Sequence, residues 1–287
     1  MKIAYLITAY NNYEHLKRLI EALNDNEVVF FLHIDKKSIM PKNLSEFNNL
    51  VYIKRIKVWW GAWSHLKAII SLMRESITYN FDYYILISGT DFPIRPNSFL
   101  YEKLKNGGEY INLVKGFMSH KPESRMRFYY LDGFDRRNSK SYKTKFFLLI
   151  EKVLKKVIIK TTYPFQEVYH GSTWWALSHR SIVYVLNFID DNPNFVKFYT
   201  TCWCPEESFV HTIIGNSKLK NNCKTNLTFT DWSSNPSPAL INTEHVELFK
   251  KQIEFESTYG LYSPFFARKF EDSSVEVVEL IIKELRN

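Results

Sequence analysis

The chain has 287 residues, 45% of them apolar and 16% aromatic, which excludes a disordered protein and leaves room for one large α/β domain or two small ones. Its formal net charge of +8 favours an anionic partner, such as a nucleotide, a nucleic acid, an acidic glycan or a membrane surface. Lys and Arg are scattered over most segments, which argues against a dedicated nucleic-acid patch.

The first residues, MKIAYLITAY, carry one Lys and a short apolar run. They pass directly into a segment in which Leu16, Leu19, Ile20 and Leu23 keep helical spacing. This pattern predicts a strand followed by a helix, not a signal peptide. No uncharged apolar stretch approaches the roughly 20 residues that a membrane-spanning helix needs. The sequence therefore predicts a cytoplasmic protein.

Strands and helices alternate along the first hundred residues. The pattern predicts strands at 2–8, 27–34, 51–56 and 83–88, and helices at 12–24 and 64–75. Such alternation predicts a mostly parallel sheet with helices on both faces. Neither a Gly-x-Gly-x-x-Gly after the first strand nor a P-loop occurs, so a dinucleotide fold and a Walker-type site are not supported.

The strand at 83–88 ends abruptly in Ser88, Gly89, Thr90 and Asp91. Polar residues at the carboxyl end of a buried strand are how α/β sheets present ligands, although an ordinary turn has the same composition. Asp35 follows the second strand in the same way.

Residues 118–165 are basic and aromatic, and we interpret them as an insertion beside the sheet of a single domain spanning 1–287. The insertion contains Arg125 and Arg127 and an amphipathic helix with many lysines. That helix could lie on an anionic membrane. The favoured alternative buries its apolar face and leaves the lysines in water. In this alternative the core-facing residues are Phe146, Leu149, Ile150 and Leu154.

The segment YHGSTWWALS predicts a strand, and RSIVYVLNFID a helix after it. Residues 204–214, CPEESFVHTII, begin a further helix that carries Glu206 and Glu207 in its first turn. Successive helical residues project about 100° apart, so one glutamate can face a cleft while the other stabilises the helix dipole. Near the C-terminus, Arg268 and Lys269 suit a diphosphate, although a surface pair is equally common.

Three cysteines, Cys202, Cys204 and Cys223, are an odd number in a long chain, so reduced thiols are expected. The spacing of the first two departs from the usual zinc knuckle, and a structural role is favoured over a metal site with His211.

Taken together, these segments resemble the core-2/I-branching family of β-1,6-N-acetylglucosaminyltransferases, glycosyltransferase family 14, which also includes the peptide O-xylosyltransferases. Seven segments match in the family's order: HIDKK at 33–37, WWGAWS at 59–64, LISGTDFPI at 86–94, GSTWWALS at 171–178, CPEES at 204–208, DWSSNPSP at 231–238 and FARKF at 266–270.

The resemblance implies a GT-A type α/β fold and an inverting transfer from a UDP-sugar to a hydroxyl group of a glycan or protein. It implies that Glu207 is the general base and that Glu206 is its structural neighbour. It also implies that no cofactor or divalent metal is needed, and that Arg268 and Lys269 hold the leaving diphosphate. The sequence contains no Asp-x-Asp, a pair that commonly chelates a metal in GT-A enzymes.

By the same resemblance, donor-binding residues are expected on three motifs and near the C-terminus: Asp35, Trp63, Ser64, Gly89, Thr90, Asp91, Arg268 and Lys269. Arg125 and Arg127 are expected to contact the acceptor or a phosphate group. Trp174 and Trp175 could offer an aromatic face to a sugar ring of the acceptor. Core packing of at least one tryptophan is also expected, because adjacent strand residues point to opposite sides.

One position departs from the family pattern. Relatives carry a second phosphate-binding Arg two or three residues before the Asp-Trp of the 231–238 segment, where this chain has Thr228. Either Lys224 or Arg268 is expected to take its place, or the diphosphate is held more weakly.

The expected partners are UDP-N-acetylglucosamine as the donor, with UDP-xylose as the main rival, and a glycan or lipid-linked glycan as the acceptor. A bacterial-type enzyme of surface polysaccharide synthesis is expected, cytoplasmic or peripheral at the inner face of the membrane. A carbohydrate-binding protein without turnover and a nucleic-acid binder are the alternatives from other classes; nucleic acid is not an expected partner.

Overall fold

A computed structural model describes residues 1–234 and 237–286 of the chain. Its centre is a sheet of seven strands, counted over those residues, in the order β10-β6-β9-β4-β1-β2-β3. The strands are β1 (Ile3–Ala9), β2 (Val28–Ile34), β3 (Leu50–Tyr52), β4 (Tyr83–Ser88), β6 (Glu109–Tyr110), β9 (Trp175–Ser178) and β10 (Cys223–Lys224). Strand β9 pairs antiparallel with both neighbours, and the other pairs are parallel. The predicted α/β class with a mostly parallel sheet is confirmed.

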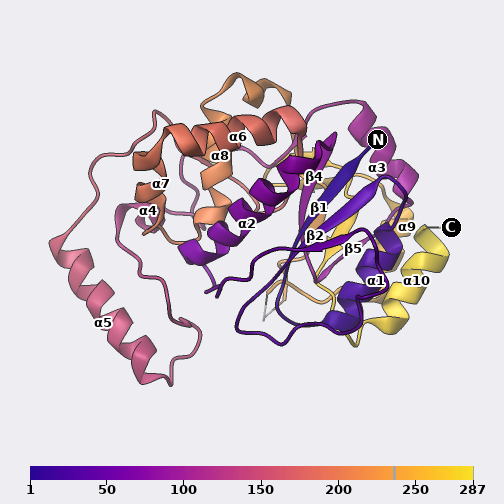
Figure 1. The fold of residues 1–287 in the computed structure, drawn as a ribbon, viewed down its shortest axis with the longest axis horizontal. Coiled ribbons are helices and arrows are strands. Elements are labelled where there is room, and N and C mark those ends of the chain that lie inside the picture. Colours follow the sequence, from indigo (N-terminus) through magenta and orange to yellow (C-terminus); the bar gives the residue numbers. More distant parts are fainter. Residues whose placement is uncertain (235–236, 287) are drawn as a thin grey trace.

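Helices cover both faces of this sheet, because its central strands are apolar on both sides. Along β1, Ile3, Tyr5 and Ile7 pack into one core and Ala4 and Leu6 into the other. The first core is completed by α1 (Tyr13–Leu23), α3 (Asn97–Lys105), α9 (Thr243–Lys251) and α10 (Val275–Leu285). The second is completed by α2 (Trp63–Ser76), α6 (His179–Asp191), α7 (Pro193–Tyr199) and α8 (Phe209–Gly215). Figure 1 shows the two helix groups on either side of β1, β2 and β4.

Smaller sheets join the C-terminal part of the chain to this core. In one of them, β5 (Asp91–Pro93) pairs with β14 (Phe266–Arg268), which pairs with β11 (Thr228–Thr230). This brings Asp91 opposite Arg268. The remaining strands form the pairs β7 (Val114–Lys115) with β8 (Tyr169–His170) and β12 (Phe255–Ser257) with β13 (Gly260–Tyr262).

The segment predicted as one strand at 169–178 is two strands in different sheets. Strand β8 pairs with β7, and β9 joins the central sheet between β4 and β6. The chain changes sheet at Gly171, where a side chain would lie 1.9 Å from the Asn112 carbonyl oxygen. Only glycine allows this approach.

The insertion predicted at 118–165 contains α4 (Ser124–Arg127) and α5 (Tyr142–Val157). Figure 1 shows α5 standing well away from the central sheet. The prediction that its apolar residues pack on the core is wrong for Phe146 and Leu149, which are exposed. The helix faces the protein with another side, on which Thr144 and Glu151 are buried. Ile150 and Leu154 are half-buried.

None of the helices in 1–234 and 237–286 combines the length and apolarity needed to cross a lipid bilayer.

Candidate active site

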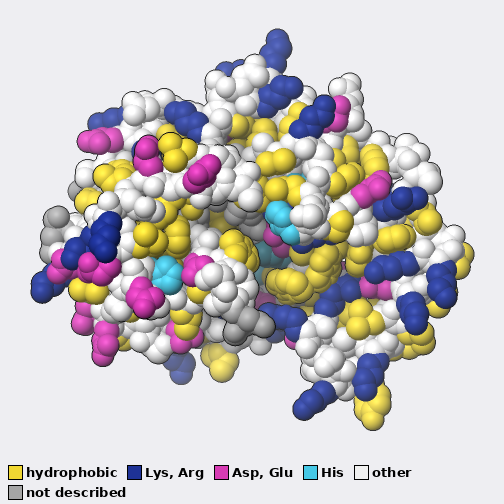
Figure 2. Space-filling model, turned by 180° about the vertical axis from the view of Figure 1, so that it is seen from behind, with side chains coloured by type: hydrophobic (Ala, Val, Ile, Leu, Met, Phe, Trp, Pro, Cys, Tyr) yellow, Lys and Arg dark blue, Asp and Glu magenta, His cyan; other side chains and the backbone are white. Residues whose placement is uncertain are grey.

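A cleft of about 1030 Å³ lies at the carboxyl ends of β1, β2 and β4. This is where ligands bind in α/β sheets of this kind. The cleft opens on the face drawn in Figure 2, where a central hollow separates two parts of the molecule. Two walls enclose it. The sheet wall consists of the strand ends and their turns, namely Asp35, Ser88–Thr90, Arg268 and Lys269. The insertion wall consists of Lys121 and Arg125 together with Glu207.

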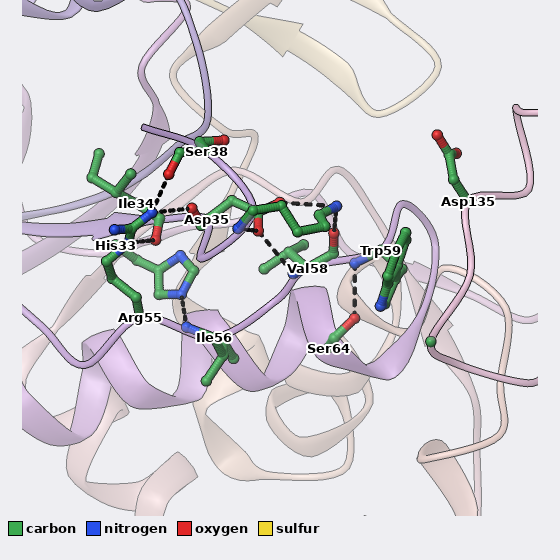
Figure 3. A network of polar contacts seen from close by, with 12 residues as sticks. His33, Ile34, Asp35, Ser38, Arg55, Ile56, Val58, Trp59, Ser64 and Asp135 are labelled. Atoms are coloured by element: carbon green, nitrogen blue, oxygen red, sulfur yellow. Dashed lines mark hydrogen bonds and ion pairs between the residues drawn. The ribbon is translucent and has the colours of Figure 1, made fainter. Parts of the chain in front are cut away.

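Asp35 begins the turn after β2 and is 7% exposed. Its Oδ1 accepts hydrogen bonds from the backbone N–H of Lys37 at 2.9 Å and of Val58 at 3.3 Å. The Lys37 ammonium lies 3.1 Å from Oδ2. The Arg55 guanidinium donates to the Asp35 carbonyl oxygen at 2.8 Å, which ties the turn to the next segment of the chain (Figure 3). The carboxylate is therefore held in a fixed position at the rim of the sheet.

His33, near the end of β2, holds the segment that contains Ile56 beside the Asp35 turn. Its Nε2 accepts a hydrogen bond from the backbone N–H of Ile56 at 3.1 Å (Figure 3). Burial lowers the pKa of His33 to about 4, so the ring is neutral at physiological pH and can act as this acceptor.

The turn after β4 packs directly on the end of β1. The Gly89 backbone N–H donates to the Thr8 carbonyl at 2.9 Å, and a side chain at Gly89 would lie 2.9 Å from the Ala9 Cβ. Thr90 lines the cleft, and its Oγ1 lies 2.9 Å from the Ser88 Oγ. Glycine here thus lets the turn approach its neighbour, and the polar groups around it face the cleft.

Asp91 is fully buried and does not line the cleft. It accepts hydrogen bonds from the Ser88 N–H at 2.8 Å and the Ser88 Oγ at 2.9 Å, and Arg268 Nε lies 3.1 Å from its Oδ1. Burial raises the pKa of Asp91, although Arg268 and Ser88 oppose this. The geometry makes Asp91 the anchor of Arg268, and Arg268 itself reaches the cleft.

Two cations stand on the sheet wall. The Arg268 guanidinium lies 4.5 Å from the centroid of the Trp174 ring, which fixes its plane. Lys269 lines the cleft beside it. Among the residues that the structure describes, no side-chain ion pair or hydrogen bond of the Lys269 ammonium is found. The pair can therefore offer two positive charges to an anionic ligand.

Glu207 is the carboxylate of the insertion wall. It ends a short 3₁₀ turn, η2 (Pro205–Glu207), and its side chain is 27% exposed. Its Oε2 lies 2.7 Å from Arg125 Nη1 and 3.0 Å from Lys121 Nζ. Burial alone would raise the pKa of Glu207, but the two cations lower it by more, so the pKa lies below its ordinary value. The side chain is ionised and reachable from the cleft.

The backbone of Glu207 is fixed by the motif that contains Gly171. The Gly171 N–H donates to the Glu207 carbonyl oxygen at 2.9 Å. His211 Nε2 lies 2.9 Å from the Ser172 carbonyl oxygen, and burial lowers the pKa of His211 to about 3. Its ring is neutral and holds the loop rather than contributing charge. The GSTWW and CPEES segments therefore position one carboxylate together.

Glu206 and its partner His65 also line the cleft. The Glu206 side chain is 5% exposed, and its Oε1 lies 3.1 Å from His65 Nδ1 on α2. The two glutamates have different partners, as expected for adjacent residues of a helical turn, and Glu207 is the more exposed of the two, at 27%.

Lys121 is the site residue that sequence reasoning missed. It is 5% exposed, bonds the Gly171 carbonyl oxygen, and pairs with Glu207. A buried lysine far along the chain from its partner gives no local signal. Its place four residues before Arg125, in the basic segment already singled out, was the available indication.

Besides Asp91, four predicted site residues do not line the cleft. Arg127 lies 3.8 Å from Glu123 on its own helical turn. Trp63 packs on Phe209 of the second core. Ser64 accepts from the Trp59 N–H at 2.9 Å (Figure 3). It also donates to Asp132, so it shapes the loop behind the wall. Trp175 is buried in the sheet, whereas Trp174 lines the cleft.

The position of the missing phosphate-binding Arg, Thr228, lies in β11 and lines the cleft. Lys224 does not reach it: its ammonium donates to the Gly107 carbonyl at 2.6 Å and borders a separate cavity. Arg268 does line the cleft. Of the two substitutes expected from the sequence, the geometry leaves Arg268. Two residues of the surrounding 231–238 segment lie outside the described residues.

Within the described ranges, no group of three His, Cys, Asp or Glu side chains is arranged to hold a metal ion. Cys202, Cys204 and Cys223 are free thiols.

Comparison with known proteins places these features in context. The profile of the Core-2/I-Branching enzyme family matches residues 3–252. Human xylosyltransferase 2 is 28% identical over 98% of this chain and 33% of its own length. Chimpanzee xylosyltransferase 1 is 26% identical over 94% of this chain and 29% of its own. The chain thus spans about a third of the length of these curated relatives.

Among solved structures, mouse xyloside xylosyltransferase 1 in its apo form is similar with a TM-score of 0.34 and 10% identity, over 91% of this chain and 97% of that one. Residues 1–349 of TarS from S. aureus give a TM-score of 0.32 at 12% identity, over 67% and 49% of the two chains.

Proposed function

The chain belongs to the Core-2/I-Branching enzyme family, and we propose on this basis that it is an inverting glycosyltransferase acting from a UDP-sugar onto a hydroxyl group of a glycan. The observation that carries the proposal is the position of Glu207, an ionised carboxylate in the cleft whose Oε2 lies within 3.0 Å of two cations. Across the cleft stand the two cations of the sheet wall.

In the proposed reaction, Glu207 takes the proton of the acceptor hydroxyl group as its oxygen attacks the anomeric carbon of the donor sugar. The bond between that carbon and the β-phosphate oxygen breaks, and its electron pair leaves with UDP. A single displacement of this kind inverts the configuration at the anomeric carbon. Glu207 is the only member of the insertion wall that can accept a proton, because Lys121 and Arg125 are donors.

Arg268 and Lys269 meet the negative charge that develops on the leaving diphosphate. Asp91 fixes Arg268 at 3.1 Å, so this charge is held in place before the donor binds. We propose that these cations take the place of a divalent metal, which agrees with the absence of an Asp-x-Asp pair from the sequence. Activity is then expected to survive EDTA.

For the donor we propose UDP-N-acetylglucosamine, with UDP-xylose as the second candidate because the relatives compared above are named xylosyltransferases. Discrimination between two such sugars depends on a few pocket contacts. For the acceptor we propose a glycan, free or lipid-linked, and for the place of action the cytoplasmic side of a membrane.

The test is the rate of UDP release from a panel of UDP-sugars in EDTA, for wild type and for Glu207→Gln. Transferases commonly pass their sugar slowly to water, so the acceptor need not be known. We expect one donor to be preferred, and Glu207→Gln to lower turnover about 10²- to 10⁴-fold, the usual worth of a general base. UDP affinity, measured by calorimetry, is expected to stay the same.

Glu206→Gln is the matched variant, because it makes the same chemical change one residue away. Its carboxylate is committed to His65, so we expect a much smaller loss of turnover. Equal, measurable turnover of wild type and Glu207→Gln would contradict the assignment of the base, whereas UDP-sugar binding without turnover by either protein would favour a binding protein. Strict dependence of activity on manganese would contradict the proposal that Arg268 and Lys269 hold the diphosphate in place of a metal ion.

A further inference from the structure

Helix α5 has one side that faces the protein. Thr144 and Glu151 are buried on it, Arg136 Nη1 donates to Glu151 Oε2 at 2.7 Å, and the Leu131 N–H donates to Glu151 Oε1 at 2.6 Å. The Phe147 ring stacks on Phe134 with centroids 4.9 Å apart. These contacts fix how the helix is rotated, and so decide which residues point away from the molecule.

The side that points away is apolar. Its members recur at intervals of three or four residues and so form one stripe along the helix. They are Tyr142, Phe146, Leu149, Val153 and Val157, which are 87%, 60%, 59%, 53% and 73% exposed. The stripe continues past the helix end into Ile158 and Ile159, which are also exposed. Single exposed apolar residues are common on protein surfaces, but a contiguous stripe of this length marks a contact surface.

Lysines border the stripe. At about 100° per residue, Lys145, Lys152 and Lys156 project along one edge and Lys143 along the other. The only carboxylate in the helix is Glu151, which is buried and paired with Arg136. The exposed surface of α5 is therefore apolar along its middle and purely cationic at its edges. On the side of the molecule that carries α5, the right-hand side of Figure 2, Lys and Arg side chains surround apolar ones.

We propose that α5 is a membrane-surface anchor that binds a bilayer containing anionic lipids. Apolar side chains of such a helix enter the boundary between head groups and acyl chains, while lysines extend to the phosphates. The charge pattern selects this occupant over a second copy of the chain, because two such helices would bring their lysine edges together. The position of α5 apart from the body of the molecule leaves the stripe free to meet a flat surface (Figure 1).

The anchor lies beside the cleft. The Lys143 ammonium is 5.8 Å from the Trp59 ring centroid, and the next residue, Trp60, lines the cleft. A bilayer bound to α5 would therefore lie close to the cleft entrance. The proposal itself does not depend on the chemistry proposed for the cleft.

The experiment is co-sedimentation of the full chain with vesicles of phosphatidylcholine alone or mixed with phosphatidylglycerol. We expect the wild type to bind the mixed vesicles, more weakly as salt rises, and not the neutral ones. The variant Phe146→Ser with Leu149→Ser is expected to lose most of this binding. The triple variant Lys145→Gln, Lys152→Gln, Lys156→Gln is expected to lose on the order of 100-fold in partition coefficient.

Each variant has a matched control. Ile253→Ser with Ile282→Ser removes two exposed apolar side chains elsewhere, and Lys105→Gln, Lys218→Gln, Lys251→Gln removes the same net charge from other surfaces. Both controls should bind as the wild type does. Circular dichroism and thermal unfolding check that all variants fold.

Three outcomes would overturn the proposal. The wild type could fail to bind mixed vesicles, or the two lysine triples could lose binding equally, which would indicate a general effect of net charge. Sedimentation velocity could instead show a dimer that Phe146→Ser with Leu149→Ser dissociates, and the stripe would then be covered by a second copy.

Discussion

The two walls of the cleft are built by different means. On the sheet wall, strand register and backbone hydrogen bonds set the positions: Gly89 bonds Thr8 of the neighbouring strand, and Asp35 bonds Ala9 through its N–H at 2.9 Å. On the insertion wall, ion pairs between distant segments set them, as Arg125 and Glu207 show, 82 residues apart. Rigid backbone suits binding, whereas close charges suit the tuning of a proton acceptor.

The ion pairs of the insertion wall also reduce the basicity of Glu207. Two cations keep Glu207 ionised, but a carboxylate with a lowered pKa is a weaker base. For the proposed role of Glu207 as the general base, this arrangement keeps the carboxylate ionised but lowers its basicity. Contacts that draw Arg125 or Lys121 away when the acceptor binds would strengthen it.

The largest loss of UDP affinity on the sheet wall is expected from Lys269→Ala. This change removes a cation that faces the cleft, and charged hydrogen bonds are worth about 1.5–3 kcal/mol, so UDP should bind about 10- to 100-fold more weakly. Isothermal calorimetry with UDP measures this. The control is Lys251→Ala, an exposed lysine at the end of α9. Unchanged UDP affinity in Lys269→Ala would move the diphosphate site off the sheet wall.

The smallest effect is expected from Lys224→Gln. Its ammonium is bonded to the Gly107 carbonyl and lies outside the cleft, so UDP affinity should stay within about twofold of wild type. The same calorimetric titration applies. A loss as large as that of Lys269→Ala would show that Lys224, and not Arg268, replaces the missing arginine near Thr228.

The same contrast explains what the sequence could predict. Asp35 and the turn at Ser88–Asp91 directly follow apolar strands, so strand pattern alone placed them at one edge of the sheet. Which side chain of the turn faces the ligand did not follow, because Asp91 turns inward to Arg268 through a pairing with β14 that local pattern does not contain. Burial of at least one tryptophan was predicted, but strand alternation is not its reason: β9 begins at Trp175, and Trp174 and Trp175 both pack in the second core.

On the insertion wall, the sequence predicted Glu207 and Arg125 as site residues but did not predict that they form an ion pair. Lys121 was missed because its partner is brought to it only by the tertiary fold. Helix α5 was predicted as an amphipathic helix, but of its predicted apolar face only Phe146 and Leu149 belong to the exposed stripe. Periodicity reveals which residues share a face, but not what that face meets, and so its burial was predicted wrongly.

The central claim is that Lys121 and Arg125 hold Glu207 ionised as the proton acceptor. The most direct measurement is the pH dependence of kcat/KM for UDP release, which reports the free enzyme, in wild type and Arg125→Gln. Activity should be full above the pKa of Glu207 and fall as pH drops below it. Because the wild-type pKa is lowered, its acidic limb should lie below the ordinary range of a glutamate. Loss of one cation raises that pKa, so the limb of Arg125→Gln should move to higher pH. An acidic limb at the same pH in both proteins would contradict the account.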